Sequence, residues 1–226
     1  MSVDYRVISI GTLSAHRLWS ESRPVRTGHA TIVLVEEGDR RILVDPSLPE
    51  QILAARFSER TGKGLDWVTD VFCTTLRPIH RRGIEALSHA DWFCSQAELE
   101  AYRHHLESLS DSASRLDAEQ LDAIEADQQL LESFRPAEDK LSAQVSLFPL
   151  PGASVGSAGL LLTPPTKTIL VVGDAVLTGE HMRAGQIWQG AIDADAAGAS
   201  FREALEIADV IIPGHDNVQF SPQRWF

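Results

Sequence analysis

The chain has 226 residues, of which 43% are hydrophobic and 23% charged, as is ordinary for a globular rather than a disordered protein. The formal net charge of −12 disfavours nucleic acid and anionic membranes as partners. There is no CxxC pattern, no apolar run long enough to cross a membrane and no signal-peptide pattern at the N-terminus. We therefore expect one domain, residues 1–226, that is cytoplasmic and has no nucleic-acid or membrane partner.

The first part of the chain is rich in predicted strands. YRVISIGTL near the N-terminus and residues 29–37 are typical of strands, and the turn Gly38-Asp39 joins the second of these to RRILVD. Two β-branched runs joined by such a turn predict a hairpin. A further strand, WVTDVFCTT at 67–75, leads into the segment TTLRPIH, and DWFCS follows at 91–95.

The middle of the chain is predicted to be helical. Ser95 and Glu98 have the spacing of a capping box, and apolar residues then recur every three or four positions. A second helix is expected from about Leu116 to Phe134, with Pro136 ending it. Segment 96–135 is a candidate lid or homodimer surface, and the sequence does not distinguish these roles.

The last part of the chain returns to strands. SAQVSLFPL, AGLLLTP and KTILVVGD are followed by a helix expected to open at Ser200, with Glu203 three residues later, and by the strand DVIIPGHD. The hairpins at 29–45 and 158–173 are antiparallel, so simple βα alternation fits poorly. Two β-rich parts around a helical middle predict two packed sheets with helices outside.

Polar side chains stand at the ends of four predicted strands: Asp45, His80, Asp174 and His215. Such residues, from separated parts of a chain, suit a shared site in a cleft between sheets. Two imidazoles and one carboxylate can hold a divalent ion and leave positions open for water or substrate. On spacing alone, a surface or hydrogen-bonding role for each histidine stays open.

The order of these segments resembles the metallo-β-lactamase superfamily, an α/β (α+β) hydrolase fold of four layers, αββα. Five segments between residues 31 and 216 carry the resemblance: RILVDPSLP, TTLRPIHRRG, LPGASVGSAGLLL, VVGDAVLT and IIPGHD. The last two are most similar to the lactonase-like branch. The resemblance implies a cleft for a small-molecule substrate and a site for divalent metal.

The metal-binding pattern of that family is incomplete in this chain. The family's main loop reads Thr-His-x-His-x-Asp-His, and alignment on His80 puts Thr75 and Arg77 in place of two histidines and Ile79 in place of the aspartate. Ala153 stands where the family's Pro-Gly-His-Thr block has a third histidine. The resemblance therefore implies that all three nitrogen ligands of the first metal are missing.

The residues that remain are His80, Asp174 and His215, candidate ligands for one divalent ion (zinc, manganese or iron) or for none. The resemblance places Arg77 near the position of the first metal, where its guanidinium could stabilise an anionic group. Arg77 and Asp174 are therefore the candidate catalytic residues. Alternatively, Arg77 pairs with Asp174 and removes it from metal binding.

Two functions follow from these alternatives. The chain is either a binding module or inactive homologue for a small anionic or carbonyl-bearing molecule, without dinuclear hydrolysis, or a single-metal hydrolase of an ester, lactone or thioester. Among the other residues, His16, His29 and His181 could reach the cleft, although turn hydrogen bonding is the simpler interpretation. Trp19 and Trp188, in predicted loops, are candidates to line it.

Overall fold

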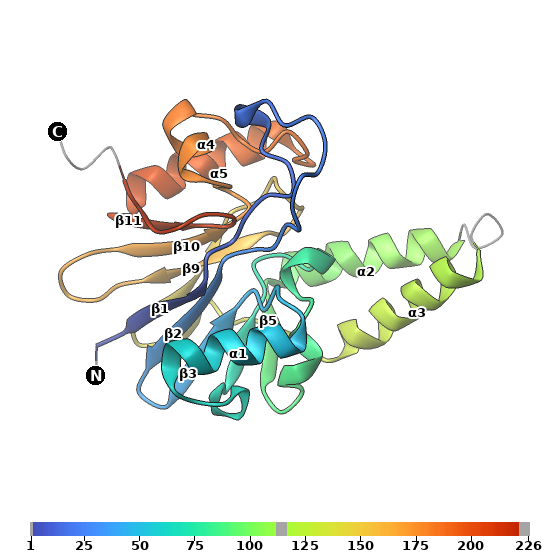
Figure 1. Cartoon of the computed structure of the whole chain (residues 1–226), viewed down its shortest axis with the longest axis horizontal. Helices are drawn as coiled ribbons and strands as arrows, with labels where there is room; N and C mark the ends of the chain where they lie inside the picture. The colour runs from blue at the N-terminus through green and yellow to red at the C-terminus, as the bar shows by residue number, and fades with distance from the viewer. Residues whose placement is uncertain (1, 112–116, 222–226) are drawn as a thin grey trace.

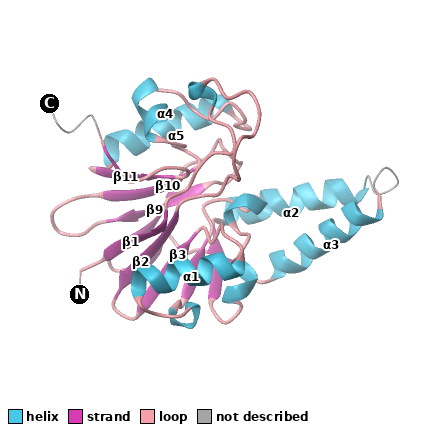
Figure 2. Cartoon of the chain, viewed as in Figure 1, coloured by secondary structure: helices cyan, strands magenta, loops and turns pink. Residues whose placement is uncertain are grey.

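The protein, seen here as a computed structural model, contains two six-stranded sheets that pack face to face (Figures 1 and 2). The structure describes residues 2–111 and 117–221. The first sheet consists, in spatial order, of β1 (Asp4–Ser9), β2 (Ile32–Glu37), β3 (Arg40–Val44), β4 (Asp70–Phe72), β5 (Asp91–Cys94) and β6 (Phe134–Pro136). The predicted hairpin is confirmed, since β2 and β3 pair antiparallel around Gly38, whose φ is +60°.

The second sheet is built from the C-terminal part of the chain. Its spatial order is β12 (Gln219–Phe220), β11 (Val210–Pro213), β10 (Ile169–Gly173), β9 (Ala158–Leu162), β8 (Val145–Pro149) and β7 (Lys140–Ser142). The α-helices are α1 (Glu50–Thr61), α2 (Gln96–Asp111), α3 (Ala118–Glu132), α4 (Gly179–Ala184) and α5 (Ala194–Ile207). Short 3₁₀ helices cover Arg17–Trp19, Leu65–Trp67, Pro78–His80 and Ile84–Leu87.

Three apolar clusters hold the layers together. Side chains such as Val33 and Ile212 fill the space between the two sheets. Phe57 of α1 packs on the outer face of the first sheet, and Phe201 of α5 packs on the outer face of the second. The predicted αββα arrangement is therefore confirmed, because each sheet buries one face on the other and one face under a helix.

Two predicted element boundaries are wrong. The last helix does not open at Ser200; it begins at Ala194, where the Asp193 side chain accepts from the Ala196 N–H. The second helix of the middle region ends at Glu132, and Pro136 belongs to β6. Because β6 is the edge strand, a residue without an N–H is tolerated there. The predicted start of that helix, Leu116, lies outside the described residues.

Helices α2 and α3 form an antiparallel pair that projects to one side of the sheets (Figure 1). Arg81 ties this pair to the loop after β4, since its Nη2 donates to Tyr102 Oη at 2.9 Å and to Asp127 Oδ2 at 2.7 Å. A role for the pair as lid or homodimer surface remains a prediction. Over residues 2–111 and 117–221, none of the helices combines the length and apolarity that a bilayer crossing requires.

Candidate functional site

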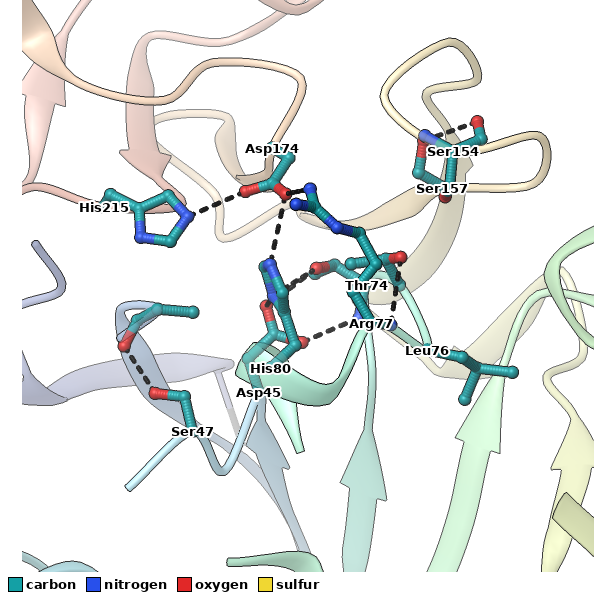
Figure 3. A network of polar contacts seen from close by, with 12 residues as sticks. Asp45, Ser47, Thr74, Leu76, Arg77, His80, Ser154, Ser157, Asp174 and His215 are labelled. Carbon is teal, nitrogen blue, oxygen red and sulfur yellow. Dashed lines mark hydrogen bonds and ion pairs between the residues drawn. The ribbon is translucent and has the colours of Figure 1, made fainter. Parts of the chain in front are cut away.

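Three polar side chains meet at one edge of the two sheets, as predicted (Figure 3). His80 ends the 3₁₀ helix after β4, Asp174 follows β10, and His215 follows β11. Strands β10 and β11 are parallel neighbours, so their carboxyl ends lie side by side, and the loop after β4 comes from the facing sheet. One ligand atom from each residue lies within 4.8 Å of the others, and all three residues are buried.

Asp174 is the centre of this group. Its Oδ1 lies 3.0 Å from His215 Nε2, and its Oδ2 lies 3.2 Å from His80 Nε2. Arg77 Nη1 donates to the same Oδ2 at 2.6 Å. Both predicted catalytic residues, Arg77 and Asp174, are thus in direct contact, and the carboxylate faces three nitrogen groups.

The far nitrogens of both imidazoles are held by acceptors. His80 Nδ1 lies 3.0 Å from Asp45 Oδ2, and Asp45 also accepts from the Thr74 N–H and Oγ1. Asp45 takes an unusual left-handed conformation, with φ +50°, which aims its carboxylate at the site. His215 Nδ1 donates to the His29 carbonyl at 2.9 Å. Such outer partners fix the orientation of a ring.

The charge of His80 follows from its position between two carboxylates. Burial disfavours the protonated ring, but Asp174 and Asp45 outweigh this and raise the pKa of His80 to about 10. Burial would likewise raise the pKa of Asp174, but His80 and His215 lower it well below its usual range. At neutral pH the group therefore holds an imidazolium and a guanidinium around one carboxylate.

The Arg77 guanidinium also contacts Trp188, whose ring centroid lies 4.0 Å from Cζ. A cation on an aromatic face is attracted to the ring, and Trp188 thereby covers one side of Arg77. A cavity of about 590 Å³ lies beside this pair, lined by Tyr102, Ala153, Val155 and others. Trp188 therefore lines the cleft, as predicted. Trp19 instead stacks on His16 at 4.2 Å.

Thr75 and the neighbour of Ala153 belong to a hydrogen-bond network around Glu98. Thr75 Oγ1 donates to Glu98 Oε1 at 2.7 Å, and Ser154, next to Ala153, donates from Oγ to Glu98 Oε2 at 2.7 Å. Glu98 is 3% exposed. Sequence reasoning missed this residue, because the capping-box spacing predicted only a local bond for its side chain.

Two of the remaining histidines lie in a cluster of their own. His16 Nε2 is 3.2 Å from Thr178 Oγ1, which is 2.9 Å from His181 Nδ1. Burial and then His16 lower the pKa of His181. His29 contacts the site through its carbonyl, which accepts from His215 Nδ1, and its own Nε2 lies 3.0 Å from the Ile10 carbonyl. Among the described residues, none of these three joins the group formed by His80, Asp174 and His215.

The donors can be tested against the requirements of a metal ion. His80, Asp174 and His215 offer two nitrogens and one carboxylate, with both rings oriented from behind, which fits one divalent ion. Thr75, Arg77 and Ala153 offer no comparable set, since the threonine hydroxyl is already bonded to Glu98 and arginine is permanently cationic. The residues that meet at this edge of the sheets therefore fit a divalent ion held by His80, Asp174 and His215.

Comparison with known proteins agrees with this fold. The sequence profile of the Metallo-beta-lactamase superfamily matches residues 25–215. No curated protein matches the chain in sequence.

Similar solved structures include AidC, a dizinc quorum-quenching lactonase in complex with the product N-hexanoyl-L-homoserine (TM-score 0.68, 19% identity, 84% of this chain and 74% of that one). A Thermotoga maritima protein described as a metallo-beta-lactamase has a TM-score of 0.69 and 16% identity, over 97% of this chain and 100% of its own. A point variant of AiiA from B. thuringiensis, with N-decanoyl-L-homoserine at its active site, has a TM-score of 0.65 and 16% identity, over 96% and 94%. The chain belongs to the metallo-β-lactamase superfamily, whose members typically bind divalent metals such as zinc.

Proposed function

We propose that this chain binds a small anionic or carbonyl-bearing molecule in the cleft at Arg77, and that it has lost the first metal site and with it dinuclear hydrolysis. The observation that carries this proposal is the 2.6 Å contact between Arg77 Nη1 and Asp174 Oδ2. A guanidinium is charged at every accessible pH, so it neutralises the carboxylate without a metal ion.

Arg77 keeps donors for a ligand. Only Nη1 bonds to Asp174, and within the described part of the chain Nε and Nη2 have no hydrogen-bond partner. The side chain is 35% exposed and opens on the 590 Å³ cavity. Guanidinium groups bind carboxylates through paired donors. The similar structures of AidC and AiiA hold N-acyl-L-homoserines, which carry a carboxylate and an amide carbonyl, so this ligand class is the first to test.

A second candidate function is a single-metal hydrolase of an ester, lactone or thioester. It is favoured by the 4.8 Å grouping of ligand atoms on His80, Asp174 and His215. A divalent ion there, when bound, supplies Lewis acidity and lowers the pKa of a coordinated water. Arg77, released from Asp174, would stabilise the developing oxyanion. Ile79 cannot accept the proton from water, which counts against this candidate.

Metal content separates the two candidates. Protein purified without chelator or nickel resin should contain fewer than about one ion per ten chains if Arg77 holds Asp174, and near one ion per chain if the site is mononuclear. Thermal stability is measured before and after zinc or manganese is added. One bound equivalent, with a higher melting temperature, would favour the hydrolase over metal-free binding.

Ligand binding tests the role of Arg77 directly. Calorimetric titration with N-hexanoyl-L-homoserine should show binding to the wild type and a loss of about tenfold or more in Arg77→Met, because charge-assisted bonds to a carboxylate are removed. Arg56→Met, at an exposed position on α1, is the matched control and should bind like the wild type. Equal binding by all three proteins would refute a ligand site at Arg77.

A further inference from the structure

A second buried carboxylate joins two loops that are distant in sequence. Glu98 Oε1 accepts from Thr75 Oγ1 at 2.7 Å and from the Leu76 N–H at 2.9 Å. Its Oε2 accepts from Ser154 Oγ at 2.7 Å and from the Gly156 N–H at 3.1 Å. We call these five residues the Glu98 cluster. Burying a carboxylate is costly unless its acceptor positions are filled, and here four donors fill them.

The first turn of α2 brings the two loops together. Ser95 Oγ accepts from the Glu98 N–H at 3.0 Å and donates to the Gly156 carbonyl. A Cβ added to Gly156 would lie 2.0 Å from the Glu98 nitrogen, so only glycine permits this close approach. The negative charge of Glu98 is also placed favourably, near the N-terminus of a helix.

We propose that Glu98 is a positioning residue, whose carboxylate ties loop 74–77 to loop 153–156 and thereby fixes Arg77 and the width of the cavity beside it. Arg77 follows Leu76 directly, and its own N–H donates to Thr75 Oγ1 at 3.4 Å. Arg77 lines one wall of the 590 Å³ cavity, and residues 153–155 line another. Both walls are therefore attached to the same carboxylate. The inference rests on the proposed function only for the role of Arg77.

This arrangement has a consequence for metal dependence. All four donors to Glu98 are neutral hydroxyl or backbone groups, and none of them needs an ion to keep its place. The two loops should therefore keep their mutual position when the protein is treated with a chelator. A loop pair joined through a metal would loosen under the same treatment.

Hydrogen–deuterium exchange read out by mass spectrometry tests the cross-link. In Glu98→Ala, peptides that contain Leu76 and peptides that contain Gly156 should both lose protection by about tenfold or more, because each amide loses a bond to a charged acceptor. Glu98→Gln keeps one carbonyl oxygen, so its amide protection should lie between that of the wild type and that of Glu98→Ala. Glu100→Ala, an exposed carboxylate two residues further on α2, should match the wild type. Loss of protection in only one of the two segments would overturn the cross-link.

A double-mutant cycle keeps the test valid even where Glu98→Ala does not fold. Thr75→Val and Ser154→Ala each remove one hydroxyl that donates to Glu98, one from each of the two loops. The folding equilibrium constant of each variant is measured by urea denaturation. If both hydroxyls act through Glu98, the fold-loss of this constant in the double variant should differ from the product of the two single fold-losses by about threefold or more. The cycle is then repeated in Glu98→Gln, where the coupling should shrink. Simple additivity in the wild-type background would overturn the proposal.

Ligand binding distinguishes positioning from mere stability. With N-hexanoyl-L-homoserine as the probe, Glu98→Gln should weaken binding about threefold to tenfold at a temperature where the variant remains fully folded. Unchanged binding in Glu98→Gln would overturn the positioning role. If the wild type itself does not bind the probe, the proposed ligand class fails, whereas the exchange and coupling results still decide whether Glu98 joins the loops.

Discussion

Two buried carboxylates, Asp174 and Glu98, both bond to residues of loop 74–77 and have different kinds of partners. Asp174 is surrounded by Arg77, His80 and His215, which are side chains that carry or can carry charge. Glu98 is surrounded by two hydroxyls and two backbone N–H groups. We call the first group the Asp174 cluster. The two clusters share the same loop, since Thr75, Leu76 and Arg77 are consecutive.

These partners determine whether each cluster can give up its hydrogen bonds in favour of a metal ion. Imidazoles can give up a proton and turn a lone pair to a metal ion, and a guanidinium can move away from a carboxylate. A backbone N–H cannot become a ligand, and it needs an acceptor wherever it is buried. The Asp174 cluster therefore has side chains that can bind a metal ion, whereas the backbone N–H donors of the Glu98 cluster cannot act as metal ligands.

The largest decrease in the free energy of unfolding is expected from Asp174→Asn. The change removes the charge at the centre of the Asp174 cluster and leaves the buried His80 partly uncompensated, at a cost of about 3–5 kcal/mol in the free energy of unfolding. Urea denaturation measures this. Asp39→Asn, in an exposed turn, is the control and should change stability by less than about 0.5 kcal/mol. A loss as small as the control's would show that Asp174 does not organise the site.

A smaller decrease in the free energy of unfolding is expected from a change in the Glu98 cluster. Thr75→Val keeps the shape of the side chain and removes one donor to a buried carboxylate, which should cost about 1–3 kcal/mol in unfolding free energy. Thr75→Ser keeps the hydroxyl, so its unfolding free energy should fall clearly less than that of Thr75→Val. The two variants are compared by urea denaturation. Equal losses would mean that the methyl group, not the hydrogen bond, stabilises this loop.

Arg77→Met is expected to raise the zinc affinity of the Asp174 cluster by about tenfold, because the competing cation is removed from Asp174. Competition with a fluorescent zinc chelator measures the affinity. Arg82→Met, whose guanidinium donates to the Gly28 carbonyl away from Asp174, serves as the control. A decrease in affinity would show that Arg77 and a metal ion do not compete.

A third carboxylate, Asp127, has an intermediate environment, with a side chain 25% exposed and bonds to Tyr102 Oη and Arg81. Burial and then Asp127 raise the pKa of Tyr102 from 10.0 to about 12. The pKa of Tyr102 is higher in the folded than in the unfolded protein, so the protonated phenol stabilises the folded state. This contribution is complete below pH 10.0 and is lost as the pH rises through about 12. The stability difference between wild type and Tyr102→Phe should therefore shrink over that interval in urea denaturation. A constant difference would exclude the titration of Tyr102 as its source.

The Asp174 cluster could be predicted from sequence because its members follow apolar strands. Residues that end neighbouring parallel strands, such as Asp174 and His215, must lie together at one edge of a sheet. The contact of Arg77 with Asp174 was one of two alternatives, since sequence does not fix the direction of a long side chain.

The Glu98 cluster could not be predicted in the same way. The Ser95–Glu98 spacing correctly predicts the bond from the Glu98 N–H to Ser95 Oγ. The side chain of Glu98, however, has partners in two other loops, which only the folded arrangement brings near. The β6 strand was missed for a related reason, because Pro136 reads as a helix stop and its place at a sheet edge is a tertiary feature.

We propose that the first metal site no longer exists in this chain. The most direct measurement is an anomalous difference map of crystals soaked in zinc, for the wild type and for Arg77→His. We expect no zinc peak between Thr75, residue 77 and Ala153 in either protein, and at most one ion at the Asp174 cluster. A zinc peak between those three residues, in either crystal, would contradict it.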